Sequence, residues 1–238
     1  MKKYILKYAL ILLVACLGMQ QAGAKVWYVN SSAVTWQGKA EADVKTSIAD
    51  AISAAAAGDQ VWVASGTFNL SATITLKNGV SLYGGFDGKE NNIDDRERVV
   101  NGKSWEFLNS TVLDGQGKYA VMTGAKFTTA VVIDGFTLQN GKANKGGGMV
   151  SQDNTVVQHC IFLKNSATDA GGGLNLEGAG SLAFECYFTG NSAKHGGGAA
   201  IGTNGTMRKC LVAANKTIAT ASSYWADGWG GGVMCNNS

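Results

Sequence analysis

Hydrophobic and polar residues alternate in short runs along most of the chain. In 181–188 (SLAFECYF), Leu182, Phe184, Cys186 and Phe188 fall on one face, which is the period of a half-buried β-strand. Four such runs are copies of one phrase that reads GFTLQN, CIFLKN, CYFTGN and CLVAAN, ending at Asn140, Asn165, Asn191 and Asn215. The steps between these asparagines are 25, 26 and 24 residues. A repeat of this length is one supersecondary unit that buries its apolar side only by stacking on its neighbours.

The residues between the runs indicate which kind of solenoid this is. A glycine triplet follows each copy, beginning at Gly146, Gly171, Gly196 and Gly230. Gly, Asn and Ser suit tight corners, because they tolerate positive φ or bond the backbone with short side chains. The sequence has no leucine ladder and no 3.6-residue period, which excludes leucine-rich and helical repeats. It therefore predicts an all-β, single-domain parallel β-helix with about 25 residues per coil.

One segment before the repeats has a helical pattern. Over Val44–Ala57 the apolar residues recur on one face, Thr46 or Ser47 can cap the start, and Gly58 can end it. A short amphipathic helix in front of a β-helix covers the open end of the core and blocks an edge strand. We therefore expect an N-terminal capping helix.

The repeats resemble those of two groups of surface proteins. The F-x-x-N of Phe162–Asn165 and Phe188–Asn191, each followed by a Gly-rich segment, is similar to the repeat of chlamydial polymorphic outer-membrane proteins. This chain departs from that repeat at the third small residue, where the family normally has Ala and the glycine triplets here have Gly. The runs AGDQVWVASGTF (57–68) and ITLKNGVSLYGGFDG (74–88) resemble the opening of large β-helix surface proteins of Bacteroidetes-type bacteria. The resemblance implies a right-handed, pectate-lyase-like β-helix that is secreted or surface-anchored. In that group functions are mostly adhesive or unknown.

The first 24 residues have the pattern of a signal peptide. Three lysines precede an apolar core, Ala9–Leu17, which is too short to span a bilayer as a helix of about 20 residues. We expect cleavage after Ala24, and the alternative is a lipobox that makes Cys16 a lipidated N-terminus. Both imply a secreted or cell-surface protein of the outer membrane of a Gram-negative bacterium. No other run is long and apolar enough for a membrane span.

These features divide the chain into three parts. Residues 1–24 form the signal peptide, 25–110 the N-terminal cap and first irregular coils, and 111–238 the regular coils. The sequence stops inside a coil directly after a glycine triplet. We therefore expect it to continue into a longer chain.

The charges do not favour an anionic partner. Lys and Arg number 20 against 17 Asp and Glu, and three lysines lie in the predicted signal peptide, so the remainder is neutral. We expect no nucleic-acid partner, because such binding needs a basic patch. The run Asp87–Arg98 (DGKENNIDDRER) is dense in both charges and is expected to be a solvated loop.

An enzyme on this fold would most plausibly cleave polysaccharide. A lyase needs carboxylates that hold Ca²⁺ against a uronate and an Arg or Lys as base, and a glycoside hydrolase needs two or three converging carboxylates. The acids of this chain are scattered along the sequence, and the catalytic candidates are Arg208, Asp134 and Glu185. We expect no catalysis and no cofactor, with Ca²⁺ required only under the lyase alternative.

Cysteine and histidine positions also follow the repeat. Cys160, Cys186 and Cys210 should stack one above another as buried, inert thiols and not as metal ligands, because a zinc site needs converging segments. His159 is expected to face outward beside Cys160. GQGKYA (115–120) matches a dinucleotide fingerprint, but strand-like residues follow it where the cofactor needs a helix.

The fourth repeat carries an insertion. Its glycine triplet begins 34 residues after the previous one, and the extra residues lie in Thr217–Trp229. The ligand-binding candidates there are Tyr224, Trp225, Asp227 and Trp229. Exposed aromatic residues beside an acid suit stacking on sugar rings or contact with a protein, and the alternative is a local minicore on the flank of the coils. We expect a non-catalytic adhesion or binding module for polysaccharide or a host or matrix protein, with a polysaccharide-degrading enzyme and a structural stalk as alternatives.

Overall fold

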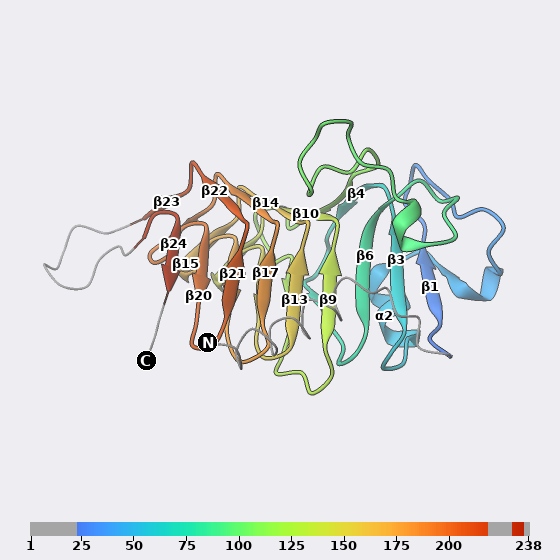
Figure 1. The fold of residues 1–238 in the computed structure, drawn as a ribbon, viewed down its shortest axis with the longest axis horizontal. Helices are drawn as coiled ribbons and strands as arrows, with labels where there is room; N and C mark the ends of the chain where they lie inside the picture. Colours follow the sequence, from blue (N-terminus) through green and yellow to red (C-terminus); the bar gives the residue numbers. More distant parts are fainter. Residues whose placement is uncertain (1–22, 219–229, 236–238) are drawn as a thin grey trace, which may run out of the picture.

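The chain folds into a right-handed parallel β-helix (Figure 1). The structure is a computed structural model that describes residues 23–218 and 230–235. Its coils stack along one axis, and their strands form four sheets that we name A to D in the order in which a coil visits them. The predicted fold class is confirmed.

Sheets A and B meet at the corner where Asp134 and Arg208 end their strands of sheet A. Sheet A has the order β2 (Val44–Lys45), β1 (Val26–Val29), β3 (Gln60–Ala64), β6 (Ser81–Phe86), β9 (Val131–Asp134), β13 (Thr155–Gln158), β17 (Leu182–Phe184) and β21 (Thr206–Arg208). Sheet B has the order β22 (Leu211–Ala213), β18 (Tyr187–Thr189), β14 (Ile161–Leu163), β10 (Phe136–Gln139), β7 (Thr111–Asp114) and β4 (Gly66–Asn69). In the regular coils, one or two residues separate a sheet A strand from the sheet B strand that follows it.

Sheets C and D complete each coil. Sheet C has the order β11 (Lys142–Lys145), β15 (Ser166–Ala170), β19 (Ser192–Ala193) and β23 (Lys216–Thr217). Sheet D has the order β24 (Val233–Cys235), β20 (Ala199–Ile201), β16 (Leu174–Leu176), β12 (Met149–Ser151), β8 (Met122–Thr123) and β5 (Ile74–Thr75). The glycine triplets form the corner between these two sheets, where Gly172 leaves no room for a Cβ beside the Ser192 and Gly197 carbonyl oxygens.

The interior of the coil is filled by side chains that repeat from rung to rung. Phe162 and Phe188 are fully buried, and their rings stack with centroids 4.7 Å apart. They belong to one continuous apolar core that runs from Val29 to Ile201. Because burying apolar surface is the main favourable term in folding, this core stabilises the stack as a whole.

A ladder of asparagines runs along the corner between sheets B and C. The Oδ1 atom of Asn191 accepts hydrogen bonds from the backbone N–H and the Nδ2 of Asn165, and Asn215 does the same for Asn191. In the preceding coil, Gln139 pairs with Leu163, so the residue two positions later that faces Asn165 is Gly141 and not Asn140. Accordingly, the Gly141 N–H donates a hydrogen bond to the Oδ1 of Asn165. The alignment of the first copy on Asn140 was therefore wrong by one residue.

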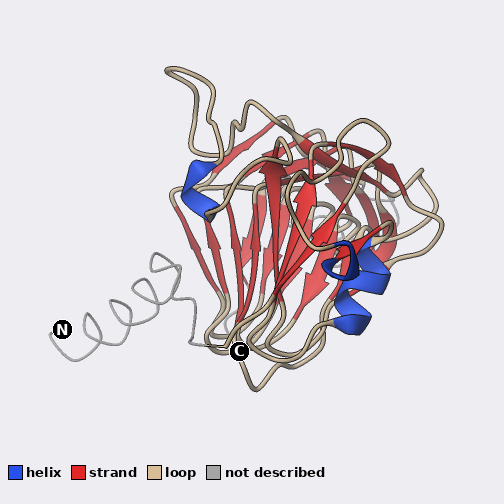
Figure 2. Cartoon of the chain, turned by 90° about the vertical axis from the view of Figure 1, so that its right-hand side faces the viewer, coloured by secondary structure: helices blue, strands red, loops and turns tan. Residues whose placement is uncertain are grey.

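The N-terminal capping helix is confirmed, although it is shorter than expected. It is α2 (Ile48–Ala54), and Ser47 caps it by accepting a hydrogen bond from the Asp50 N–H at 3.0 Å. Its apolar face belongs to the main core, and it lies at the N-terminal end of the stack (Figures 1 and 2). Within the described residues, the other helical segments are the 3-10 turns η1 (Glu41–Asp43) and η2 (Ile93–Asp95).

A second, smaller core lies on the outer face of sheet A near its N-terminal end. It contains Trp36, Trp62 and Phe86, and Tyr28 packs against it. The Trp62 and Phe86 rings stack at 4.8 Å, and the Tyr28 and Trp36 rings are also 4.8 Å apart. This aromatic cluster ties the segments that flank β1 and β6 to the outside of the coil.

The run Asp87–Arg98 is not the fully solvated loop that its composition suggested. Glu90 is buried, and its carboxylate accepts hydrogen bonds from three successive backbone N–H groups, those of Asp87, Gly88 and Lys89. Arg96 is also buried, because the segment that joins β6 to β7 folds back over the corner of the coil. Charged residues can be buried when each finds a partner, which composition alone does not reveal.

No helix in the described part of the chain has the length and apolarity needed to cross a membrane. The predicted signal peptide, up to residue 22, lies outside the described residues.

Candidate functional site

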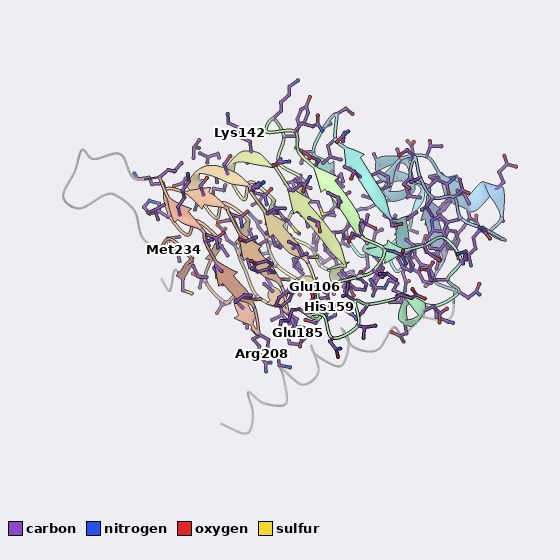
Figure 3. All side chains as sticks on the ribbon, turned by 90° about the horizontal axis from the view of Figure 1, so that it is seen from above. Glu106, Lys142, His159, Glu185, Arg208 and Met234 are labelled. Carbon is purple, nitrogen blue, oxygen red and sulfur yellow. The ribbon has the colours of Figure 1, made fainter. Side chains whose placement is uncertain are left out.

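The three catalytic candidates lie along one corner of the coil. Asp134 is in register with Gln158, Phe184 and Arg208 on successive strands of sheet A. Glu185 occupies the next position, at the bend into sheet B. Figure 3 shows His159, Glu185 and Arg208 following one another along this edge, away from Lys142 and Met234.

The bend itself places charged side chains in a column. Gly135, His159, Glu185 and Lys209 have φ of 80°, 49°, 49° and 51°. Positive φ is unusual for residues other than glycine, and here it turns the chain from sheet A into sheet B in these four coils. We name Asp134, His159, Glu185 and Lys209 the charged ridge.

Asp134 is the buried end of the ridge, with 3% of its surface exposed. Its carboxylate accepts hydrogen bonds from Gln158 Nε2 at 2.9 Å and from the Arg96 guanidinium at 3.3 and 3.4 Å, and its Oδ1 lies 3.1 Å from His159 Nδ1. Burial alone would raise the pKa of Asp134, but Arg96 and the hydrogen bonds from His159 and Gln158 more than offset it and hold that pKa well below its usual range.

In the rest of the ridge, acidic and basic side chains alternate. His159 Nε2 is 3.6 Å from Glu185 Oε2, and Lys209 Nζ is 3.3 Å from Glu185 Oε1. The imidazole of His159 is thus held between two carboxylates, with 16% of its side chain exposed. His159, which the sequence predicts to face outward beside Cys160, has its ring between two carboxylates and is not a free surface group.

The segment between β6 and β7 packs onto this corner. The Arg96 guanidinium lies 5.3 Å from the Phe86 ring and 4.8 Å from the Phe107 ring, and Phe107 meets His159 edge-on at 6.5 Å. Farther along, Trp105 stacks on Tyr187 of β18 at 5.6 Å. Sequence reasoning missed Arg96, and its place in a run of mixed charge gave no signal that it pairs with Asp134, 38 residues later.

These contacts decide what the ridge can do. Asp134 is enclosed and ion-paired, both nitrogens of His159 face carboxylates, and Glu185 is paired with Lys209. A general acid or base must reach the substrate's proton, and in this structure each carboxylate of the ridge already faces a basic side chain. Arg208 is exposed, but Gln158 and Phe184 separate it from Asp134. In the described part of the chain, no group of three or more His, Cys, Asp or Glu residues is placed to hold a metal ion.

A groove of about 510 Å³ lies on the other side of the molecule's N-terminal half, between the cap and the strands β4 and β5. Its lining includes the apolar residues Ile48, Phe68, Leu70 and Ile74, which also belong to the main core or pack against it. The lining further contains six residues whose hydroxyl or amide side chains make no hydrogen bond within the described residues: Ser32, Thr46, Thr67, Asn69, Ser71 and Thr73. None of the lining residues is charged. The sequence analysis did not find this groove, because its segments come together only through the coil.

A second groove, of about 570 Å³, follows the bend from sheet D back to sheet A. Its charged groups are already engaged: Lys126 pairs with Asp153 at 3.0 Å, and Glu177 faces Lys145 at 3.9 Å. Asp153 also accepts a hydrogen bond from the Ala179 N–H. The charged side chains of this groove are therefore already paired within the protein.

The cysteines stack as predicted. Cys160, Cys186 and Cys210 occupy the same place on three successive coils, because the residues after them pair as Ile161, Tyr187 and Leu211. Cys160 and Cys186 are fully buried, and Cys210 is partly exposed. Cys235 lies on sheet D and is separate from this column. The binding candidates Tyr224, Trp225, Asp227 and Trp229 lie outside the described residues.

Comparison with known protein families identifies a match over most of the chain. The model of the DUF1565 family, described as a protein of unknown function, matches residues 29–219. No curated protein and no solved structure matches the chain. The matched range includes the charged ridge, the uncharged groove and the cysteine column, and it brings no assigned activity to any of them.

Proposed function

The chain belongs to the DUF1565 family, and we propose that it is an exported cell-surface β-helix that binds neutral polysaccharide without cleaving it. The observation that carries this proposal is the uncharged groove beside the N-terminal cap. A polysaccharide is the ligand class that its lining fits best.

The lining of the groove matches the two surfaces of a sugar ring. The C–H face of a sugar is apolar and packs on aromatic and aliphatic side chains, and the lining offers Phe68 and Leu70 for such packing. The hydroxyl groups of a sugar need donors and acceptors, which Asn69, Ser71 and Thr73 can supply because their side chains have no partner among the described residues. An acidic sugar would need a cation beside it, and the lining holds none.

The charged ridge supports binding without cleavage. Its carboxylates are occupied by Arg96, His159 and Lys209, so the converging free acids of a glycoside hydrolase are not assembled there. A lyase would use Ca²⁺ and a free basic residue, and Arg208 has no carboxylate beside it in its column. The two alternative functions, a polysaccharide lyase and a structural stalk, are distinguished from binding by measuring retention and cleavage together.

The test follows retention and bond cleavage together. The purified protein is passed over immobilised neutral and acidic polysaccharides with Ca²⁺ and with a chelator, and the eluate is assayed for new reducing ends and for unsaturated products. We expect retention on a neutral polymer, no cleavage in either condition, and loss of retention in Asn69→Ala. Asn144→Ala is the matched control, because Asn144 is an exposed asparagine on β11, away from the groove lining.

Three results would count against the proposal. Cleavage that requires Ca²⁺ would favour the lyase, and no retention on any polymer would favour the stalk. Equal retention by the Asn69 and Asn144 variants would move the binding site elsewhere. In that case Trp225→Ala and Trp229→Ala would test the prediction that the Thr217–Trp229 insertion binds the ligand.

A further inference from the structure

The cysteine column places the thiols of Cys160, Cys186 and Cys210 one above another on three successive coils. Cys186 is the middle residue, with one neighbouring cysteine on each side. All three point the same way, since each Sγ lies near a carbonyl oxygen of the preceding coil: Ile133 at 3.7 Å, Val157 at 3.5 Å and Ala183 at 3.6 Å. Neither the proposed function nor the charged ridge uses these groups.

The spacing of adjacent rungs is close to what a disulfide requires. The backbone pairs directly at these positions, because Tyr187 N donates to Cys160 O and Leu211 N donates to Cys186 O, both at 2.9 Å. Neighbouring strands lie about 4.8 Å apart, within the range of about 4.4–6.8 Å seen between Cα atoms of a disulfide. The Cβ atoms must approach to about 3.8 Å, so one rung has to shift by about 1 Å relative to the other.

Two features favour the outer pair over the inner pair. Cys210 is partly exposed, whereas Cys160 and Cys186 are fully buried, so only Cys210 can meet an oxidant in solution. Among the described strands, β21 and β22 on either side of Cys210 are the last of sheets A and B, so each has a neighbour on one side only. The required shift is therefore available to Cys210 and not to Cys160.

The reactivity of the two thiols also differs. The hydrogen bond from Cys186 lowers the pKa of Cys210, whereas burial raises the pKa of Cys186 well above its usual value. The thiolate is the nucleophile in disulfide exchange. Cys210 is thus the attacking group, and Cys186 is the resolving group beneath it.

We propose that Cys186 and Cys210 form a reversible disulfide that links two successive coils. The Cys210 thiolate attacks one sulfur of a small-molecule disulfide, which forms a mixed disulfide and releases one thiolate. Cys186 then attacks the Cys210 sulfur and its proton passes to the departing thiolate, which forms the Cys186–Cys210 bond and releases the second thiol. In sum, two thiols lose two protons and two electrons, and the oxidant's disulfide is reduced to two thiols. The step needs only such an oxidant and does not depend on glycan binding.

The experiment uses oxidised glutathione as the oxidant and the full chain. After incubation the protein is unfolded, its remaining thiols are alkylated, and the modified cysteines are mapped by peptide mass spectrometry. We expect a Cys186–Cys210 cross-link that dithiothreitol removes. The same cross-link should form in Cys160→Ala and in Cys235→Ser, and should be absent from Cys210→Ala.

Cys186→Ala distinguishes the two steps. Without the resolving thiol, Cys210 should stop as the mixed disulfide and carry one glutathione. The proposal is overturned if Cys210 keeps glutathione in the unaltered protein, if Cys186 remains alkylatable after oxidation, or if the cross-link joins Cys160 or Cys235 instead. A cross-link that forms only after unfolding in urea would also overturn it, because the native stacking would then play no part.

Discussion

The asparagine ladder gives the sharpest test of the register. Asn191 is fully buried, and its side chain takes part in four hydrogen bonds: two accepted from Asn165 at 2.9 and 3.0 Å, one donated to the Phe162 carbonyl at 2.8 Å, and one donated to Asn215 at 2.9 Å. In Asn191→Ala, the Asn165 N–H loses its acceptor inside the coil.

The magnitude follows from these bonds. A buried N–H left without a partner costs about 1–3 kcal/mol, and each further hydrogen bond lost costs about 1 kcal/mol. With three further bonds lost and a small cavity left, we expect Asn191→Ala to lower the free energy of unfolding by about 5 kcal/mol. This is a large share of the roughly 5–15 kcal/mol that stabilises a typical domain.

Asn140→Ala is the matched control. The repeat pattern alone gives Asn140 and Asn191 the same role, but in the structure Asn140 bonds Asp114 at 2.8 Å in a half-buried site with φ of 51°. Ala214 has φ of 55° at the corresponding corner of a later coil, so alanine is tolerated there. We expect a loss of about 1 kcal/mol from one hydrogen bond and mild backbone strain.

The assay is urea unfolding at neutral pH, followed by tryptophan fluorescence, with the midpoint and slope fitted for each variant. If Asn191→Ala does not fold, Asn215→Ala serves in its place, because its ladder position is half-exposed and water can replace part of the loss. Equal losses for Asn140→Ala and the ladder variant would falsify the register and the energetic role of the ladder.

The remaining predictions concern pH and backbone space. Burial raises the pKa of Tyr83 to about 12, so the contribution of its neutral form to the free energy of unfolding is complete below about pH 10 and is lost as the pH rises toward 12. In Tyr83→Phe, the free energy of unfolding should no longer fall over this alkaline range. The pKa of Asp134 is lowered from 3.8, so the contribution of its ionised form to the free energy of unfolding is present above that pH and falls as the solution becomes more acidic. Asp134→Asn should remove this loss of stability at acidic pH. Because the variant leaves Arg96 without its carboxylate partner, it should also lower the free energy of unfolding by about 3 kcal/mol at neutral pH. Gly172→Ala places a Cβ against two carbonyl oxygens and should destabilise the coil by several kcal/mol (about 3). Gly231→Ala, the same position in the last described coil with nothing nearer than 3.6 Å, should change the urea midpoint little.

The sequence predicted the repeat well because the coil is local in its chemistry. Positions such as Cys186 and Phe188 recur at nearly constant spacing, so one rung predicts the next, and the fold class, the capping helix and the cysteine column are confirmed. The one-residue error at Asn140 arose because the corner residue directly precedes the ladder residue in each coil. The first copy has asparagine at the corner and Gly141 at the ladder position, whereas the later copies have asparagine at the ladder position.

The candidate site was far less predictable. Asp134 was a candidate catalytic acid from the sequence, but its partner Arg96 comes from an irregular segment that obeys no period. The groove likewise depends on Thr46, Asn69 and Ser71 meeting in space, although each is an ordinary surface residue in the sequence. Repeats predict contacts between equivalent positions, and these contacts join positions that are not equivalent.

The direction of the asparagine ladder has a consequence for how such a chain can evolve. In every rung the amide oxygen faces the preceding coil, as at Asn165, Asn191 and Asn215. Duplication or loss of one whole coil would therefore leave each junction with the same donor facing the same acceptor. Insertion of a few residues within a ladder corner would break that match and leave the backbone N–H groups of the corner without acceptors. The length of the protein can thus change by recombination in units of one coil, while the corners accept change only by substitution.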